Sequence, residues 1–141
     1  MISPTRPGKS SRLPSNNFPV MKVTEAAFFG YPVTDLPRAR KFYEGILGLK
    51  PTGEPTTVAW IEYDLGNATL GLGAYPGWAP ARDGSMISLE VEDFEQAVAE
   101  LRQASVPFHY EPVETPVCHF TIVRDPDENA VMIHKRKPGH A

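Results

Sequence analysis

Two stretches of the chain, residues 31–43 and 89–101, repeat one pattern of apolar and polar positions, 58 residues apart (89 minus 31). Each begins with alternating residues, reaches an Asp, and continues with apolar residues at helical spacing. Asp35 and Asp93 are expected to cap the two helices, because a carboxylate there accepts the free N–H groups of the first turn. The pattern therefore predicts strand, cap and helix twice, with Gly48 and Pro107 ending the helices.

Extended segments follow each predicted helix. Alternation, which is typical of strands, is clear at Val58, Trp60 and Glu62, and again at Ala130, Met132 and His134. The expected strands, separated by turn residues, are 57–64, 68–75, 108–113, 118–124 and 130–136. Each half then consists of a strand, a helix and three further strands, and neither half could bury its sheet alone. A ferredoxin-like sandwich, whose repeat has only two strands, is the alternative fold.

The ends and the middle of the chain set the domain boundaries. Residues 1–20 are rich in Pro and Ser and poor in apolar side chains, so they predict a flexible arm. Its prolines and the lack of a long apolar stretch argue against a presequence or a secretory signal. The remainder, 21–138, is expected to be one domain, with module 1 at about 21–76 and module 2 at about 84–138.

Composition narrows the classes of function. The 141 residues are 41% hydrophobic and 22% charged, as in ordinary globular proteins. A net charge of −3 offers no general basic field for nucleic acid, and the apolar runs are too short to cross a membrane. Cys118 is the one cysteine, which excludes an internal disulfide and predicts a cytoplasmic protein.

Four motifs in this order are similar to those of the vicinal-oxygen-chelate superfamily: Tyr31–Asp35, Phe42–Leu49, Leu89–Asp93 and Asp125–Asn129. That superfamily includes glyoxalase I, extradiol dioxygenases, fosfomycin-inactivating transferases and bleomycin-resistance proteins. The resemblance covers about residues 22–137. It implies an α+β fold in which two βαβββ modules with curved mixed sheets form a cup, with helices on the outside, usually in a homodimer.

The resemblance also implies where metal ligands would lie. Phe28, Met86, Met132 and the Leu70/Gly71 pair stand at those positions in this chain. Phenylalanine donates no electron pair, and a thioether is a poor ligand for Zn²⁺, Ni²⁺ or Fe²⁺. We therefore expect neither a metal site at these positions nor a cofactor.

A mostly apolar cup with a few polar groups is the expected alternative. Strand alternation places Glu90 on the face of Met86, and His134 on the face of Met132. Such a lining is typical of small-molecule pockets. The candidate ligand-binding residues are Phe28, Trp60, Glu62, Trp78, Met86, Glu90, His119, Met132 and His134. Core packing for the apolar members, and solvated strand ends for Glu90 and His134, are the structural alternatives.

Four functions remain open from the sequence. The first is metal-independent binding of an aromatic or amphipathic small organic molecule. The second is a lyase or isomerase that uses Glu90 and His134 as acid and base. The third is an enzyme with a displaced metal site built from Glu62, Glu90, His119 and His134. The fourth is a homodimer that binds a partner and leaves its cup empty.

Glu128 departs from the resembled turn, which usually carries glycine at that position. If the position requires a positive φ, glutamate costs about 1 kcal/mol relative to glycine.

Overall fold

The computed structural model describes residues 21–54 and 59–139, so the predicted arm at 1–20 lies outside the described residues. Module 1 contains β1 (Phe29–Pro32), α2 (Leu36–Arg40), η1 (Lys41–Ile46), β2 (Trp60–Asp64) and β3 (Thr69–Gly73). Module 2 contains β4 (Ile87–Glu90), α3 (Phe94–Gln103), β5 (Phe108–Glu114), β6 (Cys118–Arg124) and β7 (Ala130–Arg136).

The strands form two mixed sheets of related topology. The sheet of module 1 has the order β1-β3-β2, and that of module 2 has the order β4-β7-β6-β5. In each sheet the first strand of the module runs parallel to the last, and the other pairs are antiparallel. The predicted α+β fold of two βαβββ-like modules is therefore confirmed, and the ferredoxin-like alternative is wrong.

Over the described residues, the sheet of module 1 has fewer strands than the repeat predicts. Beyond β2, where module 2 has β5 beside β6, the described residues give one isolated bridge between Pro51 and Tyr63. Thr52 adds a backbone hydrogen bond to the carbonyl of Glu62 at 2.8 Å. Pro51 has no N–H to donate, which limits pairing along this edge. Residues 55–58, where the predicted strand 57–64 would begin, lie outside the described residues.

Aspartates cap both helices as predicted. Arg38 N donates to Asp35 Oδ1, and Gln96 N donates to Asp93 Oδ1, each at 3.0 Å. The first helix differs from a regular α-helix, because η1 continues α2 with the wider turns of a π-helix. Both Phe42 and its neighbour Tyr43 are buried there.

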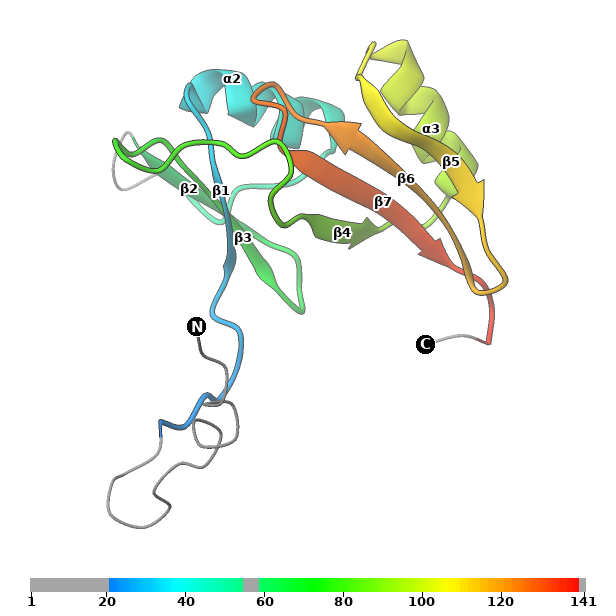
Figure 1. The fold of residues 1–141 in the computed structure, drawn as a ribbon, viewed down its shortest axis with the longest axis horizontal. Helices are drawn as coiled ribbons and strands as arrows, with labels where there is room; N and C mark the ends of the chain where they lie inside the picture. Colours follow the sequence, from blue (N-terminus) through cyan, green and yellow to red (C-terminus); the bar gives the residue numbers. More distant parts are fainter. Residues whose placement is uncertain (1–20, 55–58, 140–141) are drawn as a thin grey trace, which may run out of the picture.

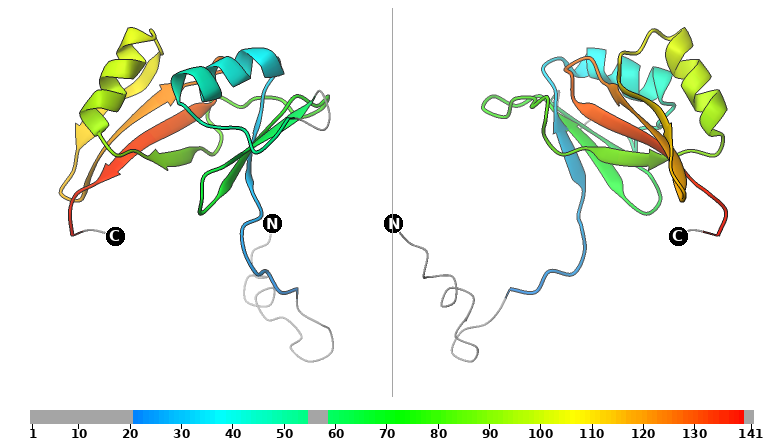
Figure 2. Two further views of the ribbon diagram at one scale, coloured as in Figure 1. Left: turned by 180° about the vertical axis from the view of Figure 1, so that it is seen from behind. Right: turned by 45° about the vertical axis from the view of Figure 1, so that its right-hand side comes forward.

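The helices pack on one face of the sheets. Figure 1 and Figure 2 show α2 and α3 on the same side of the molecule, with the two sheets spreading apart beneath them. One apolar core joins the helices to the facing side chains of both sheets: Tyr31, Leu36, Ala39, Phe42, Tyr43, Ile61, Tyr63, Leu70, Leu72, Leu101, Val123, Val131 and Ile133. The other face of each sheet, which we call its cup face, is left open.

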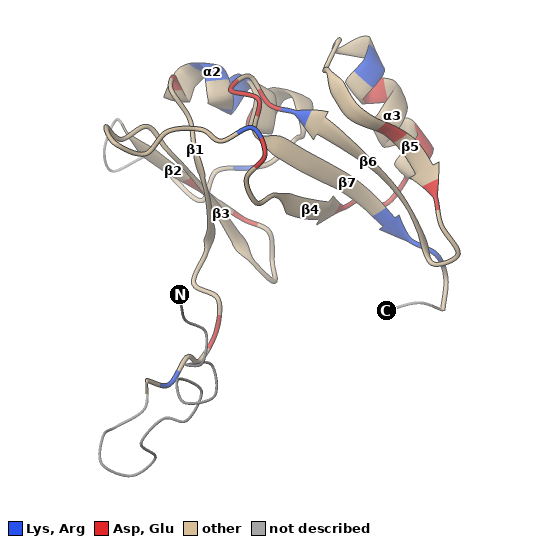
Figure 3. Ribbon diagram, in the orientation of Figure 1, with Lys and Arg blue, Asp and Glu red and all other residues tan. Residues whose placement is uncertain are grey.

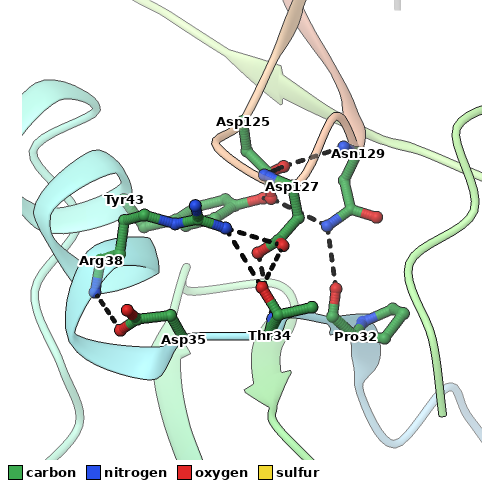
Figure 4. Close-up of polar contacts among 8 residues, drawn as sticks. All are labelled: Pro32, Thr34, Asp35, Arg38, Tyr43, Asp125, Asp127 and Asn129. Carbon is green, nitrogen blue, oxygen red and sulfur yellow. Dashed lines mark hydrogen bonds and ion pairs between the residues drawn. The ribbon is translucent and has the colours of Figure 1, made fainter.

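The turn between β6 and β7 ties the two modules together (Figure 4). Asn129 Nδ2 donates to the carbonyl of Pro32 and to Asp125 Oδ2, both at 2.9 Å, and Tyr43 OH donates to the same carboxylate at 2.8 Å. Burial raises the pKa of Asp125, although the hydrogen bonds from Asn129 and Tyr43 oppose this shift. The turn motif is therefore an anchor between modules.

Two further contacts reinforce this junction. Asp127 accepts hydrogen bonds from the backbone N–H and the hydroxyl of Thr34, and it forms an ion pair with Arg38 at 2.9 Å (Figure 4). Tyr31 OH donates to the carbonyl of Ala130 at 2.6 Å and accepts from Ile87 N at 2.7 Å. Residues of the first motif, Tyr31–Asp35, thus hold the second module in place.

Glu128 in this turn has a φ of 69°, the left-handed conformation that favours glycine. The condition for the expected backbone cost is therefore met. Its carboxylate forms an ion pair with Arg82 of the linker.

Candidate functional site

The cup face of module 1 has a floor made of glycine. Gly30 of β1 lies opposite Gly71 of β3, and Gly73 lies opposite Trp60 of β2. Strand alternation places Trp60 and Glu62 on this same face. The core residues Leu70 and Leu72 point the other way and are fully buried.

Two indole rings lie directly on this floor. A Cβ at Gly71 would overlap the ring of Trp60, and a Cβ at Gly73 would lie 2.7 Å from the ring of Trp78. A Cβ at Gly30 would lie 3.2 Å from the same ring. Glycine is therefore required at Gly71 and Gly73, because any side chain there would lift the rings off the sheet.

Phe28 and Tyr75 complete a cluster with the two indoles, which we call the aromatic platform: Phe28, Trp60, Tyr75 and Trp78. The ring of Trp60 meets Phe28 edge-on at 5.4 Å and stacks with Tyr75 at 6.3 Å between centroids. Phe28 is 51% exposed, Tyr75 44% and Trp78 37%. So large an exposed aromatic surface is characteristic of a binding site.

Glu62 is the polar group of the platform. Trp60 Nε1 donates to Glu62 Oε2 at 2.9 Å, which fixes the indole in its plane and places the carboxylate at its edge. Figure 3 shows β1 and β3 without any charged residue, so the charges of this sheet come from β2 alone, from Glu62 and Asp64.

The cup face of module 2 carries a different group. The register pairs Ser88 with Met132 and Glu90 with His134 across β4 and β7. Glu90 Oε1 lies 2.6 Å from His134 Nδ1, and Arg136 N donates to Glu90 Oε2 at 2.7 Å. Burial is the largest single influence on the pKa of Glu90 and raises it, but these two hydrogen bonds and the charges of His134 and Arg136 together lower the pKa below its usual value. His134 keeps Nε2 for another partner.

His119 points away from both groups. Its ring lies on the helix side of β6, 5.6 Å from the ring of Phe94 in α3, and its Nε2 lies 3.9 Å from Glu114. The sequence placed it among the ligand-binding candidates, but strand alternation puts it on the opposite face from Phe120, which pairs with His134.

The remaining candidates fall into two separate sets. Phe28, Trp60, Glu62 and Trp78 lie together on module 1, whereas Met86, Glu90, Met132 and His134 lie on module 2. Within the described ranges, no hydrogen bond, ion pair or ring contact joins one set to the other.

A groove of about 910 Å³ runs between the modules along the open edge of β4. Its apolar floor includes Leu47, Leu65 and Leu89, and the half-exposed Met86 together with Glu90 and His134 also line it. The aromatic platform is not part of its lining. The molecule therefore offers two distinct surfaces to a small molecule.

The residues present do not fit a metal ion. Phe28, Met86 and Met132 provide no suitable donors, and Glu90 with His134 provides two where three or four are needed. Over residues 21–54 and 59–139, no three His, Cys, Asp or Glu side chains converge as a metal site would require. The displaced site of Glu62, Glu90, His119 and His134 is not assembled in this structure.

Tyr75 is the platform residue that sequence reasoning missed. The alternation of Gly71 and Gly73 with leucine in β3 was the available signal, because glycine within a strand indicates a close approach of another group.

No helix in the described part of the chain is long and apolar enough to span a membrane.

Comparison with known proteins places the chain in a broad group. A family model described as "Glyoxalase/Bleomycin resistance protein/Dioxygenase superfamily" matches residues 25–133. No curated protein sequence matches the chain.

Several solved structures share the fold. TnmS3, an antibiotic binding protein from Streptomyces sp. CB03234, is 23% identical with a TM-score of 0.68, covering 84% of this chain and 100% of its own. A glyoxalase/dioxygenase from Nostoc punctiforme is 18% identical with a TM-score of 0.69, covering 84% and 99%. Lactoylglutathione lyase from Agrobacterium tumefaciens is 15% identical with a TM-score of 0.64, covering 81% and 95%. At these identities the likeness shows the fold alone.

Proposed function

Because the chain belongs to the glyoxalase/bleomycin resistance protein/dioxygenase superfamily, in which one fold serves several chemistries, its function must be argued from its own side chains. We propose that it binds a flat aromatic or amphipathic small molecule on the aromatic platform, without using a metal ion. The observation that carries this proposal is the pair of indoles in close contact with Gly30, Gly71 and Gly73.

Stacking gives the physical basis of this binding. Flat aromatic rings attract one another by about 0.5–1.5 kcal/mol beyond the gain from burying their area. The rings of the platform are held by backbone contact and by the Trp60–Glu62 hydrogen bond, so little conformational freedom is lost when a ligand binds. TnmS3, one of the similar structures, is described as an antibiotic binding protein, which agrees with a small organic ligand.

Intrinsic fluorescence tests this proposal directly. The protein has two tryptophans, and both belong to the platform. We expect neutral flat probes such as acridine, in a panel with aromatic metabolites and antibiotics, to change this emission and to bind with measurable heat. If no member of a broad panel binds more tightly than about millimolar, the proposal is wrong.

Phe28 and Phe29 provide a matched pair of variants. They are neighbours with similar exposure, 51% and 48%, but Phe29 pairs with Leu70 and lies on the helix side of the sheet. Phe28→Ala should weaken probe binding about fivefold or more, whereas Phe29→Ala should leave it unchanged. Equal effects of the two variants would place the ligand elsewhere.

Acid–base catalysis is the second candidate function. The observation that favours it is the 2.6 Å contact between Glu90 and His134, which orients the imidazole and leaves Nε2 for a substrate. Once a lyase or isomerase reaction is found, Glu90→Gln and His134→Ala should each lower its rate by about 10²-fold or more. Unchanged rates in both variants would eliminate this function.

A homodimer and a cytoplasmic location complete the proposal. Among the residues that the structure describes, β1 and β4 each pair on one edge only, and Phe29 and Met86 beside those edges are 48% and 40% exposed. Free strand edges with apolar neighbours favour pairing with a second copy. Light scattering after size exclusion should give twice the chain mass of 15.6 kDa. A mass that stays at one chain would contradict this part.

A further inference from the structure

Glu62 has fewer partners than the other partly or fully buried carboxylates of the described residues. Glu44 is paired with Arg40 and Asp127 with Arg38, and even the more exposed Glu90 is paired with His134 and Arg136. For Glu62, the described residues supply one side-chain donor, the neutral indole N–H of Trp60, and no cationic partner. Asp125 also lacks a cation, but its carboxylate accepts four hydrogen bonds, from Tyr43, Asn129 and the backbone of Asp127. A partly buried carboxylate with one neutral donor and no counter-charge is stabilised when a cation approaches it.

Among the described residues, the sheet of module 1 provides no cation for Glu62. β1 and β3 carry no charged residue, and the second charge of β2, Asp64, is also negative. Asp64 is already engaged, because its Oδ1 accepts from Gly66 N at 2.8 Å. Over the described residues, the cup face of module 1 therefore combines four aromatic rings with a negative charge and no positive one.

Aromatic rings and a carboxylate recognise the same kind of partner. The face of an indole attracts a cation through its quadrupole, more strongly than any other side-chain ring, and Glu62 adds a direct charge contact at the edge of Trp60. Building on the proposed function, we infer that the ligand of the aromatic platform is a cationic aromatic compound, whose positive charge lies beside Glu62.

Two probes of the same ring shape isolate the charge. N-methylacridinium carries a permanent positive charge, whereas acridine is neutral in mildly alkaline buffer. Titrations of the full-length chain, followed by tryptophan fluorescence and by calorimetry, compare the two. We expect N-methylacridinium to bind at least about fivefold more tightly than acridine, as expected for about 1 kcal/mol of cation–aromatic and charge attraction.

Glu62→Gln tests the role of the carboxylate itself. Glutamine keeps an oxygen to accept from Trp60 Nε1, so the platform is retained while the charge is removed. In this variant the preference for the cationic probe should fall to about twofold or less, because binding of N-methylacridinium weakens more than binding of acridine. Glu95→Gln, which removes the same charge from the first turn of α3 in module 2, is the control and should keep the full preference.

Each outcome decides between the two levels of the proposal. If both probes bind equally well to the unaltered protein, the inference of a cationic ligand is wrong and aromatic binding stands. Equal weakening of both probes by Glu62→Gln would mean that Glu62 acts only by holding Trp60, which also overturns the inference. If neither probe binds, this inference and the proposed function fail together.

Discussion

The two modules share one topology but expose opposite kinds of cup face. In module 1 the face consists of glycine covered by Trp60 and Trp78, a flat and rigid surface suited to stacking. In module 2 the equivalent strands carry Met132, His134 and Glu90, a surface with a hydrogen-bonded acid–base pair. The core faces of both modules, by contrast, are filled with similar apolar side chains.

This difference shows which positions of a duplicated fold are free to diverge. The core face must bury apolar area in both modules, so its residues are constrained by packing. The cup face has no such obligation, and a change there alters binding chemistry without altering the fold.

Gly71→Ala should disrupt the aromatic platform of module 1. The new Cβ would overlap the ring of Trp60, so the indole must leave the floor. We expect the free energy of unfolding to fall by about 1–3 kcal/mol and binding of aromatic probes to weaken at least about tenfold. Gly45→Ala meets nothing within 4 Å and serves as the control, with unchanged binding. Normal binding by Gly71→Ala would refute the floor's role.

Tyr31→Phe should weaken the link between the modules. Its hydroxyl bonds the carbonyl of Ala130 and the N–H of Ile87, and both would lose a buried partner. We expect urea unfolding to show a loss of about 1–3 kcal/mol. Tyr63→Phe removes a hydroxyl bonded to Glu44 within module 1 and should cost less, because Arg40 still pairs with that carboxylate. A larger loss from Tyr63→Phe would contradict this ranking.

Alkaline pH gives an independent test of Tyr31. Burial raises its pKa to about 12, although the hydrogen bond from Ile87 opposes this shift. A phenol with a raised folded-state pKa contributes stability that is complete below about pH 10 and is lost as the pH rises through the folded-state value. The stability difference between the unaltered protein and Tyr31→Phe should therefore shrink as the pH rises from about 10 to 12. A difference that stays constant over this range would refute the assignment.

Glu128→Gly should stabilise the turn of module 2. The equivalent turn of module 1 has Gly66 at a φ of 96°, whereas Glu128 holds a φ of 69° with a side chain. Because both variants remove the exposed ion pair to Arg82, the fair comparison is Glu128→Gly with Glu128→Ala. The glycine variant should be more stable by about 1 kcal/mol in thermal or urea unfolding. Equal stabilities would mean that the conformation carries no cost.

The smallest effect is the acid dependence of Glu90. Hydrogen bonds from Arg136 N and His134 lower its pKa below the ordinary value of 4.5, despite the opposing effect of burial. A carboxylate with a depressed folded-state pKa contributes stability above pH 4.5 that is lost as the pH falls through the lowered value. Melting temperatures of the unaltered protein and Glu90→Gln should differ slightly at neutral pH and converge in acid. Divergence in acid would contradict the direction of this shift.

The sequence predicted the fold well because its signals are local or repeated. Asp35 and Asp93 are helix caps, and the strands at 118–124 and 130–136 were predicted with the observed bounds. A fourth strand was predicted for module 1, but the described residues form three. Pairing at the edge of a sheet depends on neighbouring strands that no local pattern reveals. In the part of this edge that the structure describes, Pro51 forms one isolated bridge with Tyr63.

The site was predicted in part. Alternation along a strand identified Glu90 and His134 as residues of one face, and the register brings them into contact. Alternation alone could not show that His119 faces α3, nor that Tyr75 and Trp78 fold back from the linker onto the glycines of β1 and β3. These placements depend on long-range packing, which no periodicity within one segment encodes.

The anchor at the β6–β7 turn determines how the molecule comes apart. Asn129 reaches the carbonyl of Pro32 across 97 positions of sequence, and Tyr31 reaches Ala130 across 99. A module that opened alone would leave the buried carboxylate of Asp125 and the hydroxyls of Tyr31 and Tyr43 without partners on the other side. We therefore expect the two halves to unfold together, in a single cooperative transition.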